Sequence, residues 1–161
     1  ELFGSFILTF ILYVVSGGAF VFGWAKPVPY DPRFLRNPLR GAGLIAAAGP
    51  CSNLFIALVF GLVIRLFGPF LLGTPFADAL LLFHLIVFVN VLLALFNLLP
   101  FPPLDGSKIL FAFLPPRYDG VRIVLEQYGF TLLLLFVFFG FDLVQPIIEL
   151  LYRLFVGVPL L

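Results

Sequence analysis

The sequence predicts an all-α integral membrane protein, built as a bundle of about four transmembrane helices. Of its 161 residues, 63% are hydrophobic and 11% are charged, whereas charged residues make up about a quarter of a typical soluble domain. The mean hydropathy is +1.21. The long apolar runs lack the alternation of a transmembrane β-barrel, so helices are favoured. A net charge of +1 with no basic patch gives no indication of nucleic-acid binding.

Four apolar runs are long enough to cross a hydrocarbon core, which needs roughly 20 helical residues. They are predicted as spans within a single membrane domain, residues 1–161, and cover about 2–25, 41–64, 79–104 and 127–148. The Ser16-Gly17-Gly18 step weakens the first run and favours a re-entrant or extended segment before the second span. The apolar tail, residues 149–161, is expected to lie at the membrane interface.

Basic residues predict the orientation of these spans. Seven of the nine Lys and Arg fall in residues 26–40 and 105–122, two segments that four spans place on the same side. Positive residues mark the cytoplasmic side of a membrane. Both loops are therefore predicted to be cytoplasmic.

Residues 97–106, Asn-Leu-Leu-Pro-Phe-Pro-Pro-Leu-Asp-Gly, interrupt the third run. Pro100, Pro102 and Pro103 remove backbone donors and disfavour helix before them. Such backbone is tolerated at membrane depth only where it is buried in protein or lines a cavity. Asp105 is an ionisable group that is costly there. The local pattern also fits a turn or a helix start, so it leaves open a cap, a cation ligand, a metal ligand and a proton relay.

The other polar residues of the spans have simpler interpretations. Asn53 and Asn90 are predicted to form interhelical hydrogen bonds, a common use of Asn in membranes. Asn97 follows Asn90 by two helical turns and shares its face. His84 is the only histidine, and it has no Cys, Asp or Glu at ligand spacing. It is predicted to be a hydrogen-bonded structural residue.

Three segments together resemble one family. Residues 97–106 resemble the N-x-x-P-x-P-x-L-D-G motif of the site-2 proteases, the intramembrane zinc metalloproteases. Residues 22–38 resemble the segment that follows the metal-binding helix in many bacterial and archaeal members. Residues 48–53, Ala-Gly-Pro-Cys-Ser-Asn, resemble the A-G-P-x-x-N that opens the next span. The three occur in the order and at the spacing of the family, and the resemblance covers most of the chain.

The resemblance implies a zinc site and a substrate. In the family, two histidines and a glutamate come from an H-E-x-x-H helix, and the aspartate of L-D-G is the third protein ligand. Asp105 would then bind zinc, and Asn97 would position the substrate or its oxyanion. The expected substrate is a transmembrane protein segment, cut in a prokaryotic cell membrane. The structural or substrate-facing residues would be Asn53, Gly49, Pro50, Pro100, Pro102, Pro103 and Gly106.

One departure from the family is clear, because the sequence contains no H-E-x-x-H. The chain begins with Glu1 and contains no Met, so we expect a C-terminal part of a longer protein. Alone, it is expected neither to bind zinc tightly nor to cleave peptides. Two alternatives remain: a non-catalytic homologue that binds transmembrane segments, and a small cation or proton transporter that uses Asp105 with Asp142.

Overall fold

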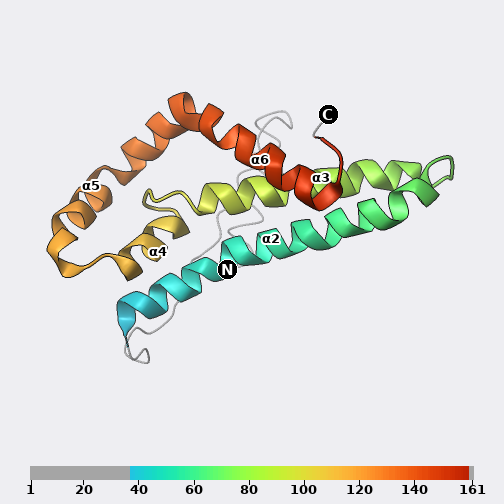
Figure 1. Ribbon diagram of the computed structural model, residues 1–161. Coiled ribbons are helices and arrows are strands. Elements are labelled where there is room, and N and C mark those ends of the chain that lie inside the picture. Colours follow the sequence, from blue (N-terminus) through green and yellow to red (C-terminus); the bar gives the residue numbers. More distant parts are fainter. Residues whose placement is uncertain (1–36, 160–161) are drawn as a thin grey trace, which may run out of the picture. The chain divides into compact units, whose positions relative to one another are not determined.

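The computed structural model describes residues 37–159, and every regular element in this range is helical, with no strand. The all-α prediction is confirmed. The elements are α2 (Pro38–Leu71), α3 (Ala77–Asn97), α4 (Asp105–Phe113), a 3₁₀ turn (Pro116–Tyr118), α5 (Asp119–Leu135), a π-helical turn (Phe136–Gly140) and α6 (Phe141–Val156), as Figure 1 shows. The predicted first span, residues 2–25, and the predicted re-entrant segment lie outside the described residues.

Within residues 37–159, three stretches are long and apolar enough to cross a membrane, namely Pro38–Leu71, Ala77–Leu98 and Pro116–Val156. Helix α2 is longer than the predicted span at 41–64, with 34 residues. It begins where Asn37 accepts a hydrogen bond from the Arg40 amide (3.3 Å) and Pro38 takes the first helical position. It continues through Pro50, which is fully buried.

A short turn reverses the chain after α2. Gly73 adopts a positive φ of 81°, a conformation that costs glycine little. The Thr74 hydroxyl donates to the Leu71 carbonyl oxygen (2.7 Å), which is one of the carbonyls left free at the helix end. Helix α3 then returns alongside α2, with which it has its most extensive packing (Figure 1).

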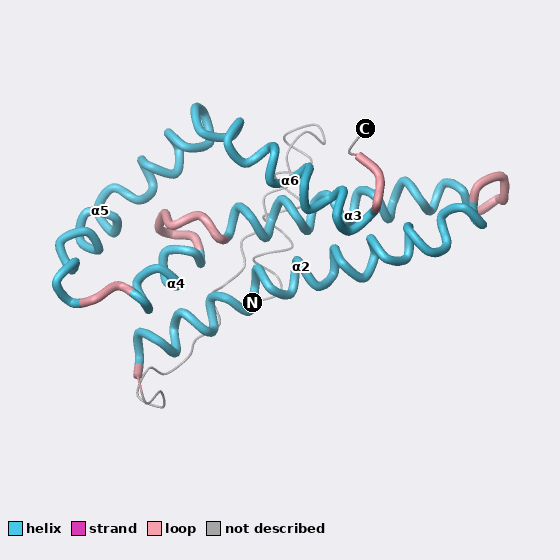
Figure 2. Tube along the Cα trace, in the orientation of Figure 1, coloured by secondary structure: helices cyan, strands magenta, loops and turns pink. Residues whose placement is uncertain are grey.

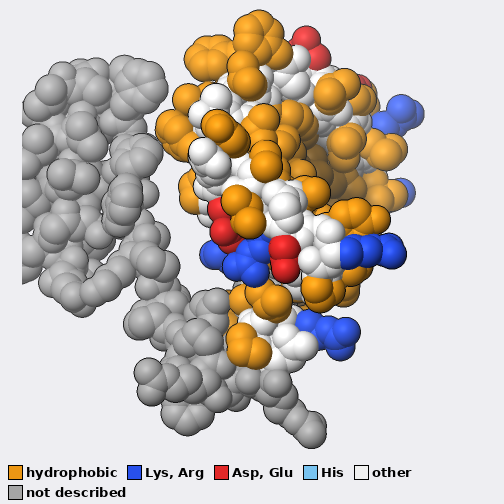
Figure 3. All heavy atoms as spheres, turned by 90° about the vertical axis from the view of Figure 1, so that its left-hand side faces the viewer, with side chains coloured by type: hydrophobic (Ala, Val, Ile, Leu, Met, Phe, Trp, Pro, Cys, Tyr) orange, Lys and Arg blue, Asp and Glu red, His pale blue; other side chains and the backbone are white. Residues whose placement is uncertain are grey.

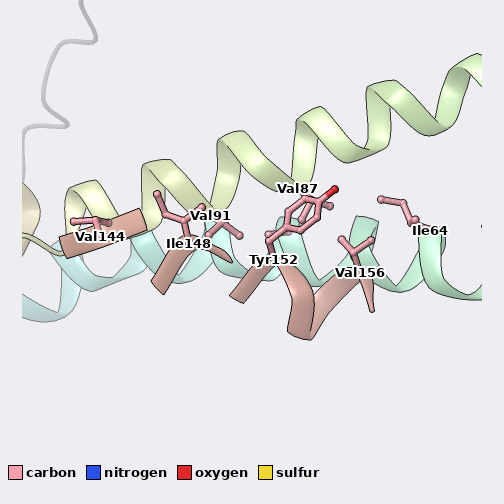
Figure 4. Close-up of a cluster of buried hydrophobic side chains, with 8 residues drawn as sticks. Ile64, Val87, Val91, Val144, Ile148, Tyr152 and Val156 are labelled. Carbon is pink, nitrogen blue, oxygen red and sulfur yellow. The ribbon is translucent and has the colours of Figure 1, made fainter. Parts of the chain in front are cut away.

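The main buried core lies where α6 packs on α2 and α3. Buried residues recur every four positions along α6, so that they form one stripe: Val144, Ile148, Tyr152 and Val156. Figure 4 shows these side chains beside Val87 and Val91 of α3. At Gly61 of α2, an added Cβ atom would lie 2.7 Å from the Cβ of Phe155, so the two helices approach closely.

The C-terminal region differs from the sequence prediction. Figure 1 shows the chain turning between α5 and α6, at the π-helical turn, where Gly140 makes room for the Phe136 ring. π-turns are a common cause of sharp bends in helices. The predicted span at residues 127–148 therefore contains this turn, with the second half of α5 before it and the first half of α6 after it. Residues 149–156, predicted as an interfacial tail, belong to α6, where Tyr152 and Val156 continue the buried stripe. Their location at the membrane interface stays a prediction.

Candidate functional site

The proline-broken segment is a non-helical connection between two helices, as predicted. Helix α3 ends at Asn97, α4 begins at Asp105, and residues 98–104 between them form no helix (Figure 2). The Pro102–Pro103 peptide bond is cis. The Ser107 hydroxyl is buried and donates to the Leu104 carbonyl oxygen (2.7 Å). This connection is called the proline loop below.

Asp105 occupies the first turn of α4, so the helix-start interpretation of the sequence is correct as far as the backbone goes. A negative charge is favoured there by the helix dipole. However, α4 has no side-chain cap hydrogen bond. Among the described residues the carboxylate is therefore not used as a cap, and its Oδ1 atom pairs with Lys108 instead.

A glycine fixes the start of α4 against the end of α3. A Cβ atom at Gly106 would overlap the backbone carbonyl oxygens of Leu98 and Leu99. Since backbone cannot rotate away as a side chain can, only glycine fits this position. This close approach places Gly106, the residue after Asp105, against Leu98, the residue after Asn97. The two ends of the motif at residues 97–106 therefore lie side by side.

A second glycine holds the proline loop from the other side. A Cβ atom at Gly129 of α5 would lie 2.6 Å from Pro102 Cδ and 2.8 Å from the Pro102 carbonyl oxygen. Beside it, the rings of Phe101 and Phe136 have centroids 5.7 Å apart. The loop is thus fixed by α4 at one end and by α5 and the π-helical turn at the other.

The Asp105 carboxylate lies between α4 and α2. Its Oδ1 atom accepts from Lys108 Nζ at 3.0 Å, and the side chain is 33% exposed. Its Oδ2 atom is the nearest atom to an added Cβ at Gly49, at 3.4 Å. Gly49 and Asp105 belong to the two separate motifs of residues 48–53 and 97–106. The fold brings these motifs together at the carboxylate.

The remaining predicted site residues belong to the same two motifs, and they differ in how exposed their side chains are. Asn53 is half-buried, one turn after Gly49 on the same face of α2. Asn97 is half-buried as the last residue of α3. Within residues 37–159, neither amide side chain makes a hydrogen bond. Pro100 and Pro103 are exposed, and Pro102 is half-buried against α5.

Two further polar residues lie away from the carboxylate. His84 Nδ1 and the Tyr152 hydroxyl form a hydrogen bond between α3 and α6, which agrees with the structural role predicted for this histidine. Asn90 Nδ2 donates to the Ile86 carbonyl oxygen (2.8 Å) of its own helix. The prediction of an interhelical bond for Asn90 was wrong, because the carbonyl one turn back lies within reach of its amide.

Among the described residues, the Asp105 carboxylate is the candidate metal ligand. A catalytic zinc takes three protein ligands and keeps one position open. Within residues 37–159, no group of three His, Cys, Asp or Glu side chains converges to hold a metal ion. Asp105 supplies one carboxylate, and Lys108 engages one of its oxygens. This part of the chain therefore does not form a zinc site by itself.

Charged side chains gather near the α4 and α5 end of the molecule. Arg122 Nε pairs with Glu126 Oε1 at 2.8 Å, and the Arg122 guanidinium lies over the Phe111 ring. Figure 3 shows basic and acidic side chains next to one another on this end, amid a mostly hydrophobic surface. Helix α4 packs against the start of α2, where a Cβ at Gly43 would overlap Ala112 Cβ. Arg40 of α2 thus lies at the same end of the molecule as the C-terminal part of α4.

The helices and the proline loop define a membrane protein with a carboxylate in a broken helical segment, and comparisons with known proteins show which family it resembles. Residues 73–136 match the model of peptidase family M50. The chain is 38% identical over 131 residues to "Putative zinc metalloprotease YwhC" of Bacillus subtilis, covering 79% of this chain and 58% of that protein. It is 32% identical over 121 residues to "Zinc metalloprotease MJ0392" of Methanocaldococcus jannaschii, covering 74% of this chain and 34% of that protein.

A second Methanocaldococcus jannaschii protein, "Putative zinc metalloprotease MJ0611", is 37% identical over 107 residues, covering 65% of this chain and 49% of that protein. No solved structure matches the chain. These matches confirm the resemblance to the site-2 proteases, which belong to peptidase family M50. The chain spans about half the length of the first curated relatives that it matches.

Sequence reasoning missed two residues that shape the site. Lys108 follows Asp105 by three positions, a spacing at which helical side chains meet, so its ion pair could have been predicted once the start of α4 was known. Gly129 had no such signal, because nothing in the sequence indicates that it faces Pro102.

Proposed function

We propose that the protein to which this chain belongs is an intramembrane zinc metalloprotease that cleaves transmembrane segments of membrane proteins. The observation that carries the proposal is the contact between Gly49 and Asp105. Two motifs that resemble the family separately, more than 40 residues apart in sequence, meet at the carboxylate expected to bind the metal. The names of the relatives support the metalloprotease class.

The depth of the carboxylate agrees with cleavage inside the bilayer. Gly49 follows Arg40 by nine residues along α2, which is about 14 Å of helix rise. If Arg40 marks the cytoplasmic interface, Asp105 lies well inside a hydrocarbon core about 30 Å thick. Helix α4 runs from Asp105 back toward the start of α2, with Ala112 against Gly43, so we propose that the part of residues 105–122 that follows α4 lies on the cytoplasmic side with residues 26–40.

In this proposal, Asp105 is one zinc ligand, and Lys108 and the α4 dipole orient its carboxylate. Zinc at such a site supplies an activated water nucleophile. The half-buried amide of Asn97 is available to hold the substrate backbone or its developing oxyanion. The proline loop lacks helical pairing, so its backbone groups can contact an unwound substrate. The 161-residue chain, with its single histidine, is proposed to be inactive alone.

The experiment is cleavage of a single-pass membrane substrate by the full-length protein in liposomes. Asp105→Asn is expected to lower kcat/KM by at least about 100-fold, since even groups that only orient metal ligands are worth 10–100-fold. Asp119→Asn is the matched control, because it removes an exposed carboxylate from the first turn of α5. Undiminished cleavage by Asp105→Asn would contradict the proposal. Absence of cleavage by the wild type, with the substrate still bound, would favour a non-catalytic homologue.

A further inference from the structure

A cavity of about 360 Å³ lies at the opposite end of α2 from Asp105, between the C-terminal parts of α2 and α6 and the N-terminal part of α3. Its wall is mainly apolar, with residues such as Leu72, Leu80 and Val156. Two polar side chains line it, Arg65 from α2 and His84 from α3. Among the described residues, no acidic side chain lines this cavity. It contains none of the residues of the candidate protease site.

The position of Arg65 places the cavity at the level of lipid headgroups. Arg40 and Arg65 bracket a charge-free stretch of α2 and are 25 residues apart, which is about 38 Å of helix. The hydrocarbon core is about 30 Å thick, and the bilayer with its headgroups is about 40–45 Å. Two arginines at this spacing fit the two headgroup regions. The cavity around Arg65 then opens where phosphates are abundant.

The two polar side chains can both act as donors. The Arg65 guanidinium carries several N–H groups and no acceptor. It makes no ion pair within residues 37–159. When the Tyr152 hydroxyl donates to His84 Nδ1, the neutral imidazole carries its proton on Nε2. That N–H has no hydrogen-bond partner among the described residues. An anion is therefore the ligand that this pair suits, and the apolar wall suits an acyl chain.

We infer that this cavity binds an anionic phospholipid, with Arg65 and His84 contacting the phosphate and the apolar wall contacting the acyl chains. Arginine matches phosphate geometry with paired N–H groups. A net negative headgroup is favoured over a zwitterionic one, because the part of the cavity wall formed by residues 37–159 has no carboxylate to pair with an ammonium group. Arg65 also lies beside Gly157, at the C-terminal end of α6, so a bound lipid would connect α2, α3 and α6.

The test is lipid binding to the full-length protein in detergent micelles, followed by native mass spectrometry. The probes are phosphatidylglycerol, phosphatidylethanolamine, diacylglycerol and inorganic phosphate. Phosphatidylglycerol is expected to bind tightest, and diacylglycerol at least about tenfold more weakly, as expected for loss of a charge-assisted hydrogen bond. Equal retention of diacylglycerol would overturn the proposal. Binding of inorganic phosphate without retention of any phospholipid would show a free-anion site and would also overturn it.

Variants assign the two donors. Arg65→Ala is expected to weaken phosphatidylglycerol binding about tenfold, and Arg65→Lys to restore most of it. Arg153→Ala is the control, because Arg153 is exposed at the same end of α6 and does not line the cavity. An equal loss in Arg65→Ala and Arg153→Ala would indicate general surface charge and contradict the site.

The role of His84 is separated from its structural hydrogen bond by two further variants. His84→Phe removes both the cavity donor and the bond to Tyr152, whereas Tyr152→Phe removes only the bond. His84→Phe is expected to weaken lipid binding severalfold more than Tyr152→Phe, at matched thermal stability. Equal binding by the two variants would overturn the assignment of His84 to the phosphate.

Discussion

The two ends of the α2–α3 pair are held together by different kinds of contact. Toward the turn between α2 and α3, α6 inserts a stripe of large buried side chains into the helix pair. Around Asp105, the buried positions of α4 and α5 are mainly small: Gly106, Ser107 and Gly129, with Leu133. The first region depends on filled volume. The second depends on backbone approaching backbone across glycines.

This difference suits the roles proposed for the two regions. A well-packed core is rigid and tolerates little change in volume. Close backbone contacts fix the proline loop while leaving its polar groups and the Asp105 side chain partly accessible. Helix α5 has no extensive packing on α2 or α3 in the described part of the chain, and it touches the loop at Gly129. The comparison predicts that the core is damaged by removing atoms and the site by adding them.

Removing atoms from the core should have the largest effect on stability. Ile148→Ala leaves a cavity in the buried stripe of α6, where Ile148 is 4% exposed. We expect a loss of about 2–5 kcal/mol, the range for buried Ile→Ala, measured by unfolding of the full-length protein in detergent. Ile147→Ala on the exposed side of the same turn should cost less than about 0.5 kcal/mol. Equal losses would mean that the stripe is not a packed core.

Adding atoms at the site should have the next largest effect. Gly106→Ala forces a Cβ onto the Leu98 and Leu99 carbonyl oxygens, and overpacking of this kind costs about 1–3 kcal/mol. Gly120→Ala is the control, because nothing lies within 4 Å of a Cβ there. In that helical position alanine should gain up to about 1 kcal/mol. Thermal unfolding distinguishes the opposite signs, and a neutral Gly106→Ala would contradict the close approach.

Removing one hydrogen bond from the core should cost less. Tyr152→Phe keeps the buried ring and deletes the hydroxyl that bonds His84. Interhelical hydrogen bonds in membrane proteins average about 0.6 kcal/mol, so we expect a loss of about that size in detergent unfolding. Tyr118→Phe, at an exposed tyrosine, should be neutral. A loss above about 2 kcal/mol would show that the His84–Tyr152 pair contributes more than the packing around it.

Breaking the exposed ion pair at the site should have the smallest effect on stability. Lys108→Ala removes the partner of Asp105 Oδ1, but the Lys108 side chain is 50% exposed. Such pairs are worth about 0–1 kcal/mol and weaken in salt. Unfolding at low and high salt should therefore show a small loss that shrinks as salt increases. A large, salt-independent loss would mean that Lys108 has a packing role.

The sequence predicted features that local chemistry determines. Long apolar runs predicted the helices, and three prolines predicted the break before Asp105, because both depend on backbone pairing within a segment. The close approach of Asp105 to Gly49 was not predicted, since no local rule relates residues so far apart. The continuation of α6 through Tyr152 was not predicted, because its stripe of buried residues can be recognised only once α6 is seen to pack against α3. The close approach of Gly129 to Pro102 could not be predicted for the same reason, because it depends on how α5 packs against the proline loop.

The account depends most on Asp105 being a zinc ligand in the full-length protein. The direct measurement is the zinc content of that protein, purified without added metal, for the wild type, Asp105→Ala and the control Asp119→Ala. We predict about one zinc per wild-type and Asp119→Ala molecule, and a zinc content near zero for Asp105→Ala with its fold intact. A full zinc content in Asp105→Ala would contradict the assignment, and with it the proposed role of the proline loop.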